Sequence, residues 1–298
     1  MKKPGITSKG LKTVEEVPFT DTRSIISEQE LMRQLDEKKG YTLYLGVFTK
    51  EEVFKILERS HLWHELTLKG FSNPLLDINT DDPHRHTLRV YFDTMDKAHL
   101  LVEIVLSDRI FKPRIRHLPS FDYSTYNMLV IEWLVLQNPL SQFGPGRPQL
   151  PDQQYPGLGI ARLVSDMLVK VATHLKKDGI LNFPQYYHNA VIYSEIFKFY
   201  DPYMHGTLMA LKASLSKYSL AQASFAVSLG CVKNLRDGDY FTWRTEELIL
   251  PLSPNLQQYF ASREYENIIR NTMKEYSFDI DAALYQYRTT HPHRLPYA

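Results

Sequence analysis

The sequence predicts an α/β (α+β) protein with a mixed, mostly antiparallel central sheet flanked by helices, and three observations lead to this expectation. Short connections separate apolar stretches early in the chain, as between antiparallel strands. A strand–helix–strand pattern over residues 127–183 then predicts a parallel pair, because such crossovers join parallel neighbours. The chain's 298 residues, 43% of them hydrophobic, suffice for a buried core.

The N-terminal part contains two capping patterns and three strand-like stretches. Residues 1–24 are polar and aperiodic, so we expect a flexible arm. Ser/Thr-x-x-Glu patterns are typical of helix starts, because the paired side chains cap the first amides. These patterns are Ser27 with Glu30 and Thr49 with Glu52, the second predicting a helix from Lys50 to about His61. The stretches expected to be strands are Tyr41–Phe48, His86–Asp93 and His99–Leu106.

The middle of the chain carries the strongest pattern. Asn127–Leu136 is apolar apart from Glu132, which predicts a strand buried on both faces. A segment rich in Pro, Gly and Gln follows over 137–156 and is expected to be a loop. Residues 157–176 then place apolar side chains at helical spacing, and a short strand is expected over 180–183.

Helices and two late strands are expected in the remainder. The predicted helices are Asn189–Tyr200, Leu208–Ser216 and Leu220–Leu229, and the predicted strands are Tyr240–Trp243 and Leu248–Leu250. Residues 254–298 are expected to be mostly helical. We therefore divide the chain into the arm, a domain over 25–252 and a helical C-terminal extension over 253–298.

Composition and charge disfavour several classes of function. A formal net charge of +1 provides no global field that would attract nucleic acid. The one cysteine, Cys231, permits no internal disulfide and no cysteine-based zinc site, which suits a cytoplasmic protein. His84-x-His86 lacks a convincing third ligand, so no metal is expected. No apolar run approaches the roughly 20 residues of a membrane helix.

The loop before the long predicted helix has the features of a phosphate site. Helix N-termini expose unpaired amides and a partial positive charge, and glycines let a ligand approach the backbone. Gln154, Gly157 and Gly159 lie at this place. No Walker A string occurs, and a dinucleotide fingerprint would need glycine where the chain has Arg162.

Gln154-x-x-Gly157-x-Gly159 resembles the Q/R-x-x-G-x-G/A signature of the GNAT (N-acetyltransferase) superfamily. The preceding strand, Ile131–Leu136, resembles the fourth strand of that family. The resemblance implies a GNAT-like domain that binds acetyl-CoA or another acyl-CoA as co-substrate. The backbone amides implied to hold the CoA pyrophosphate belong to Gly157, Leu158, Gly159, Ile160 and Ala161. The residues implied to run beside the pantetheine, with strand-like hydrogen bonds, are Val135, Leu136 and Gln137.

A helix behind the next strand is implied to complete the site. Tyr187–Tyr193 resembles the family's N-x-x-A-x-x-x-Y helix in compressed form. The resemblance implies that Asn189 lies at the cofactor and that Tyr193 protonates the leaving thiolate. A second segment, Ala223–Cys231, also resembles this helix but has Ala226 at the place of the tyrosine. Both assignments remain open from the sequence.

The other half of the chemistry requires a base for the amine. Glu132, a carboxylate in an otherwise apolar strand, is our candidate, with Glu103 in reserve. The alternative for Glu132 is a structural ion pair with an arginine or a place on a solvated face. The expected activity is direct acyl transfer from acyl-CoA to an unidentified primary amine. The alternative is a non-catalytic acyl-CoA sensor or interaction protein, and a homodimer is compatible with either.

Overall fold

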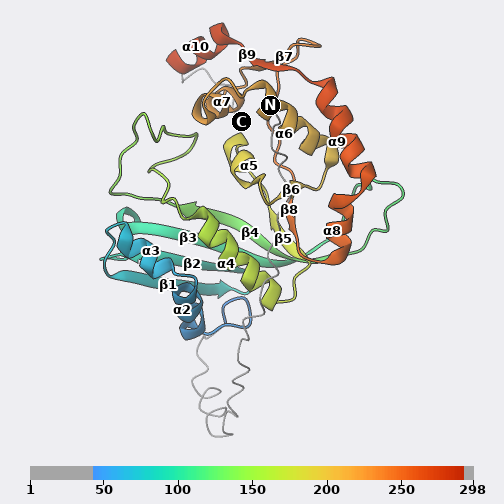
Figure 1. The fold of residues 1–298 in the computed structure, drawn as a ribbon. Coiled ribbons are helices and arrows are strands. Elements are labelled where there is room, and N and C mark those ends of the chain that lie inside the picture. Colours follow the sequence, from blue (N-terminus) through green and yellow to red (C-terminus); the bar gives the residue numbers. More distant parts are fainter. Residues whose placement is uncertain (1–42, 292–298) are drawn as a thin grey trace, which may run out of the picture. The chain divides into compact units, whose positions relative to one another are not determined.

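The computed structural model describes residues 43–291 and contains one large mixed sheet (Figure 1). Seven strands follow the order β1-β2-β3-β4-β5-β8-β6, and β7 and β9 form a separate pair. Within the described residues, β4 and β5 are the parallel neighbours and the other pairs are antiparallel. The expected mixed α/β fold with a mostly antiparallel sheet is confirmed at this level.

The strands are β1 (Pro74–Asp82), β2 (Arg85–Phe92), β3 (Leu100–Phe111), β4 (Tyr126–Leu136), β5 (Gly179–Asn182), β6 (Lys198–Phe199), β7 (Val232–Asn234), β8 (Leu248–Pro251) and β9 (Phe278–Ile280). The helices are α2 (Lys50–Arg59), α3 (Leu62–Leu68), the 3-10 turn η1 (Lys97–His99), α4 (Ala161–His174), α5 (Tyr187–Tyr193), α6 (Pro202–Ser214), α7 (Leu220–Ser228), α8 (Pro254–Ala261), α9 (Arg263–Glu275) and α10 (Ala282–Thr290).

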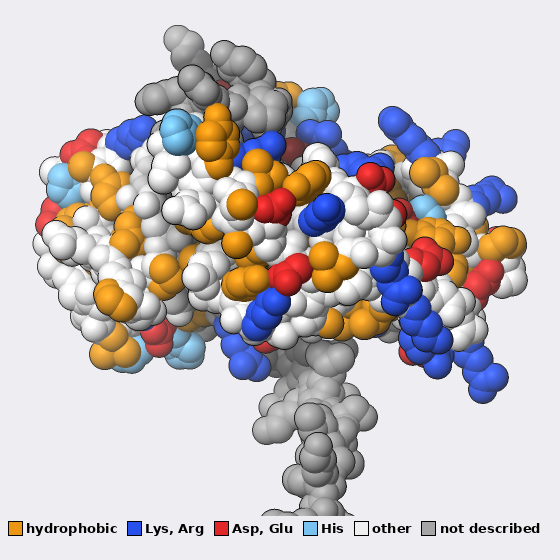
Figure 2. All heavy atoms as spheres, turned by 90° about the horizontal axis from the view of Figure 1, so that it is seen from above, with side chains coloured by type: hydrophobic (Ala, Val, Ile, Leu, Met, Phe, Trp, Pro, Cys, Tyr) orange, Lys and Arg blue, Asp and Glu red, His pale blue; other side chains and the backbone are white. Residues whose placement is uncertain are grey.

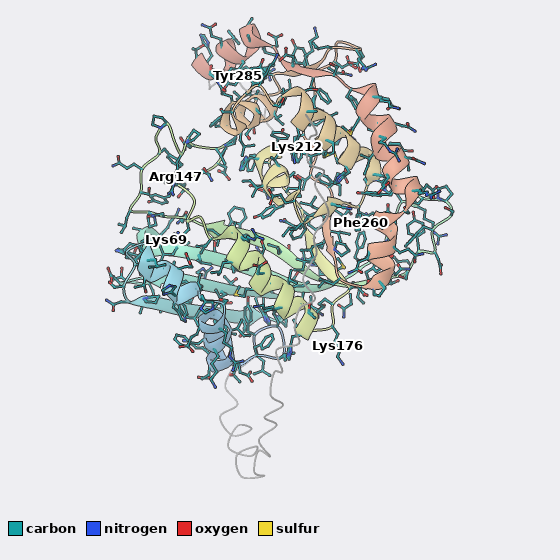
Figure 3. The ribbon with its side chains drawn as sticks, viewed as in Figure 1. Lys69, Arg147, Lys176, Lys212, Phe260 and Tyr285 are labelled. Atoms are coloured by element: carbon teal, nitrogen blue, oxygen red, sulfur yellow. The ribbon has the colours of Figure 1, made fainter. Side chains whose placement is uncertain are left out.

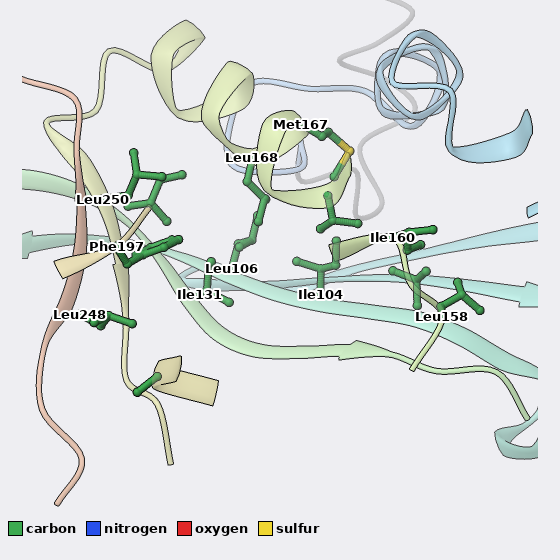
Figure 4. Packing of buried hydrophobic residues seen from close by; sticks show 14 of the residues in the cluster. Ile104, Leu106, Ile131, Leu158, Ile160, Met167, Leu168, Phe197, Leu248 and Leu250 are labelled. Atoms are coloured by element: carbon green, nitrogen blue, oxygen red, sulfur yellow. The ribbon is translucent and has the colours of Figure 1, made fainter. Parts of the chain in front are cut away.

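Strand β4 lies at the centre and is buried on both faces, as its apolar sequence predicts. Successive side chains of a strand point to opposite faces. Ile131 accordingly packs in the cluster that contains Met167 and Leu168 of α4, and Figure 4 shows the Leu168 side chain directed at the sheet. Met128 and Val130 instead join a second cluster with α8 and α9. Helical layers therefore cover both faces of the sheet at β4.

Two predictions for the beginning of the described chain have opposite outcomes. The Thr49–Glu52 capping box is present at the start of α2, as predicted. The strand expected over Tyr41–Phe48 is wrong for the part described, because Leu45 and Gly46 have left-handed backbone with φ of 53° and 72°. This reverses the chain, so that Tyr44 and Phe48 form an isolated bridge. The expected helix start at Ser27 and the arm lie outside the described residues.

The predicted boundaries of later elements differ from those observed. The long helix begins at Ala161 rather than at 157, because Gly157 and Leu158 run extended beside the end of β4. The helix expected over 189–200 is α5, which ends at Tyr193. Tyr240–Trp243 is not a strand, although the Phe241 amide donates to the Val232 carbonyl at 2.8 Å. Strand β1 was not expected because Asp and Asn are poor strand formers.

The C-terminal segment is packed against the sheet and contains a strand as well as helices. The Tyr259 and Tyr265 hydroxyls donate to the carbonyls of Tyr200 and Phe199, at 2.8 Å and 2.6 Å. Helices α6 and α9 approach so closely that a Cβ at Gly206 would lie 2.7 Å from the Thr272 Cβ. Residues beyond 252 therefore contribute to the core that supports β4.

Charge is mixed over the surface. Figure 2 shows hydrophobic, acidic and basic side chains interspersed over one face, with a denser row of Lys and Arg at one side. This distribution fits the formal net charge of +1. Over residues 43–291, no helix combines the length and the apolar character that crossing a bilayer requires.

Candidate functional site

The candidate site begins where the parallel pairing of β4 and β5 ends. The pairing runs from Met128 with Gly179 to Ile131 with Asn182. Strand β5 stops there, and Pro184, two residues on, has no amide hydrogen for a further ladder. Strand β4 continues to Leu136. The last five residues of β4 therefore lack β5 as a neighbour, and one edge of β4 is open.

A β-bulge lies at this same point. On β3, Leu106 pairs with Ile131 and Val105 pairs with Trp133, so Glu132 is an extra residue in β4. A bulge redirects the side chain of its extra residue, and such bulges are frequent beside active sites. The sequence identified Glu132 as the polar exception in the strand, but the bulge depends on the pairing with β3.

The open edge of β4 is partly closed by the loop that precedes α4. The Gln137 amide donates to the Leu101 carbonyl at 2.9 Å, which directs it toward β3, whereas the Leu158 amide donates to the Leu136 carbonyl at 3.0 Å. Backbone groups alternate in direction along a strand, so those of Leu134 face the open edge. The Leu136 carbonyl and the Gln137 amide, which the resemblance implies as partners of the pantetheine, are thus already hydrogen-bonded within the protein. Leu134, which sequence reasoning missed, offers strand-like hydrogen bonds instead.

The glycines of the loop present bare backbone to solvent. From Pro156 to Ile160, side chains are alternately buried and exposed, with Leu158 and Ile160 each 3% exposed and both glycines outward. Figure 4 shows Leu158 and Ile160 directed into the core. These two side chains anchor the segment, and at Gly157 and Gly159 only backbone atoms are exposed to a ligand. Gly159 has a φ of 74°, which a residue with a Cβ adopts only under strain.

The first turn of α4 is an uncapped helix N-terminus beside this segment. Ile160 at the cap position makes no side-chain hydrogen bond, and Val164 is the first residue whose amide donates within the helix. The amides of residues 161–163 therefore have no partner within the described chain. Unpaired amides and the helix dipole favour an anion here. Gln154 is exposed.

A lysine that the sequence did not identify supplies positive charge at the same place. Lys69, which follows α3, has its Nζ 4.0 Å from the position that a Cβ at Gly159 would occupy. Figure 3 labels Lys69 near the end of the sheet from which the 137–160 loop departs. Because α3 precedes α4 by more than 90 residues, only the tertiary fold brings this side chain to the glycine turn.

The Glu132 side chain is ion-paired. Its Oε1 accepts from the Ser107 hydroxyl at 2.6 Å and lies 2.6 Å from the Arg109 Nη2. Ser107 is paired with Val130, so this cluster shares the face of the sheet on which Val130 lies. The ion pair with arginine, one of the two alternatives from the sequence, is therefore present. The reserve residue, Glu103, pairs with Arg89 at 2.6 Å.

Helix α5 contains both Asn189 and Tyr193, one turn apart as expected. Tyr193 packs beside Phe197 at a ring separation of 5.9 Å, and burial raises the pKa of its phenol to about 12. The phenol is therefore protonated at neutral pH. Among the described residues, the hydrogen-bond and ion-pair partners of Glu132 are Ser107 and Arg109, and Tyr193 is not one of them. Helix α5 follows β5 directly, and α7, the other candidate helix, packs against α5.

A buried histidine in α5 was not singled out from the sequence. His188 is 4% exposed, stacks on Tyr186 and leaves its Nδ1 without a partner. Burial lowers its pKa to about 4, and the nearby Asp152 carboxylate opposes this shift. The imidazole is therefore neutral at physiological pH and serves as a buried ring packed on Tyr186. An isolated histidine has no sequence signal that would have revealed this role.

No family model matches the chain, and no curated protein matches it. Over residues 43–291, no group of three or more His, Cys, Asp or Glu side chains is placed to hold a metal ion.

Proposed function

We propose that this chain is an acyl-CoA-dependent N-acyltransferase with a GNAT-like arrangement of its sheet. One observation carries the proposal: the end of the β4–β5 pairing, the bulge at Glu132 and the exposed glycine turn coincide. A ligand with an anionic end at the turn and an extended arm along the open edge of β4 matches these features. Coenzyme A, with its pyrophosphate and pantetheine, has that construction.

The pyrophosphate would be held by backbone amides at the start of α4. The free amides of residues 161–163 and the outward backbone of Gly157 and Gly159 provide the donors. Lys69 adds a cation that a pyrophosphate would neutralise. The pantetheine amides would then pair with the Leu134 backbone in the manner of a short added strand.

The acyl transfer proceeds by attack of a neutral amine on the thioester carbonyl. The acceptor first gives one proton to Glu132, directly or through a water molecule. Its nitrogen then forms the C–N bond, the C–S bond breaks, and the sulfur leaves with the electron pair as a thiolate. The second amine proton neutralises the thiolate, so the products are the amide and the free CoA thiol. Holding both substrates in one complex contributes most of the rate.

Tyr193 would serve the thiolate as a hydrogen-bond donor. A thiol has a pKa of about 8.5, and burial raises the pKa of Tyr193 to about 12. Full proton transfer from this phenol would be uphill by about 5 kcal/mol. A hydrogen bond that stabilises the developing negative charge needs no such transfer. The same phenol, packed on Phe197, also fits the alternative of a non-catalytic acyl-CoA sensor.

Titration with acetyl-CoA and assay of thiol release test the proposal together. Calorimetry measures binding, and a thiol reagent then measures CoA release with a panel of primary amines. Binding with amine-dependent release supports the acyltransferase. Binding without release from any amine would favour the sensor. An absence of binding to acetyl-CoA, longer acyl-CoAs and CoA itself would refute both.

A further inference from the structure

We infer that the acceptor is an α-amino acid, or another amine with a carboxylate beside its nitrogen, held by Glu132 and Arg109. This inference rests on the proposed acyltransferase function and specifies its second substrate. It is carried by the cluster of Ser107, Arg109 and Glu132, which spans β3 and β4 at the bulge.

The cluster leaves one oxygen and one nitrogen free. Both contacts to Glu132 reach Oε1, whereas Oε2 has no partner among the described residues. Arg109 uses Nη2 for this ion pair and Nε for the Ser107 hydroxyl at 3.1 Å, and its Nη1 contacts no described group. Ser107, which is 1% exposed, thus fixes both charged side chains from beneath.

The two charged side chains differ in their access to solvent. The side chain of Arg109 is 62% exposed and that of Glu132 is 21% exposed. The guanidinium therefore faces outward, and the carboxylate lies deeper, at the bulge beside the open edge of β4. An acceptor entering from solvent would meet Arg109 first and would bring its other end to Glu132.

An α-amino acid has the complementary pair of charges. Its ammonium and carboxylate are separated by a single carbon atom, and the carboxylate and guanidinium of the cluster lie 2.6 Å apart. The ammonium would donate to Oε2 of Glu132, and the carboxylate would accept from Nη1 of Arg109. A guanidinium stays charged at all physiological pH values and matches a carboxylate geometrically. An amine without a carboxylate would leave Arg109 without a substrate partner.

The experiment compares α-amino acids with their decarboxylated amines, for example leucine with isopentylamine, in the thiol-release assay with acetyl-CoA. The amino acids should have the higher kcat/KM. In Arg109→Gln, kcat/KM for amino acids should fall roughly 10- to 100-fold, the usual effect of losing a charge-assisted hydrogen bond. The value for decarboxylated amines should change much less. Arg114→Gln removes an exposed arginine outside the cluster and should match the wild type.

The outcomes separate this inference from the function on which it rests. A purely structural role for Arg109 would lower kcat/KM for both acceptor classes by the same factor, and that result would overturn the inference. Equal kcat/KM of the wild type for both acceptor classes would also overturn the inference, although the protein would still be an acyltransferase. If acetyl-CoA binds but nothing turns over, calorimetry with the CoA-bound protein decides: amino-acid binding lost in Arg109→Gln supports the inference, and no binding overturns it. Failure to bind any CoA species refutes both.

Discussion

Substitution of Gly159 by alanine separates the conformational role of the glycine turn from its proposed contact with a ligand. Gly159 has a φ of 74°, and a Cβ there would lie 4.0 Å from the Lys69 Nζ. The new methyl group therefore clashes with nothing, and the cost to folding is the left-handed backbone strain of about 1–2 kcal/mol. For a chain of this size, each kcal/mol lowers Tm by about 2–4 °C.

Gly238 provides a matched control. Its φ is 86°, and a Cβ there would meet only the Lys233 Cε at 3.7 Å. Gly238→Ala should therefore lose about the same 1–2 kcal/mol of stability as Gly159→Ala. The two variants should differ in acetyl-CoA binding. Only Gly159→Ala places a methyl group where the pyrophosphate would approach the backbone, and its Kd should rise by about tenfold or more.

Gly157→Ala tests the contact without the strain. Gly157 does not have a positive φ, and a Cβ there would be at an ordinary 3.9 Å from the Leu136 carbonyl oxygen. Its Tm should stay close to that of the wild type, while its affinity for acetyl-CoA should fall. Differential scanning fluorimetry and calorimetry measure both quantities. If Gly157→Ala and Gly159→Ala both bind acetyl-CoA as tightly as the wild type, the glycine turn is only a structural turn and the reasoning is wrong.

Three further outcomes are expected. Lys69→Met should raise the Kd for acetyl-CoA about fivefold to tenfold at low salt, and less at high salt because screening already weakens the contact; Lys170→Met, on an exposed position of α4, should have no effect in the same calorimetric titration. Tyr193→Phe should lower kcat roughly 10- to 100-fold and leave the Kd for acetyl-CoA unchanged, and unaltered steady-state kinetics would remove Tyr193 from the chemistry. Stability should fall on acidification because burial lowers the pKa of His205 to about 4. The folded pKa of His205 lies below its unfolded value of about 6.5. The neutral imidazole therefore contributes its full stability above pH 6.5, and this stability is lost as the pH falls toward 4. By pH 5 the free energy of unfolding should have dropped by about 2 kcal/mol. His205→Asn retains an acceptor for the Phe199 amide, and urea unfolding at pH 7 and pH 5 should give it a smaller difference than the wild type.

The sequence predicted what depends on local pattern. The strand at Asn127–Leu136, the capping box at Thr49 and the parallel strand–helix–strand unit are confirmed, because periodicity and capping act within a few residues. The start of the long helix was misplaced by four residues. Gly157 and Leu158 are compatible with a helical pattern, but a hydrogen bond to the Leu136 carbonyl, more than 20 residues away, holds them extended.

The candidate site depends on pairings that no local pattern contains. The sequence identified Glu132 as a carboxylate in an apolar strand and Gly157 and Gly159 as a turn. The bulge at Glu132 and the open edge at Leu134 result from the register of β4 with β3 and β5. Lys69 reaches the turn, and Arg109 reaches Glu132, from segments that pack there only in the folded chain. The sequence alone therefore identified the carboxylate and the glycines of the candidate site. Long-range pairing and packing of the chain decided how these residues come together with Lys69 and Arg109.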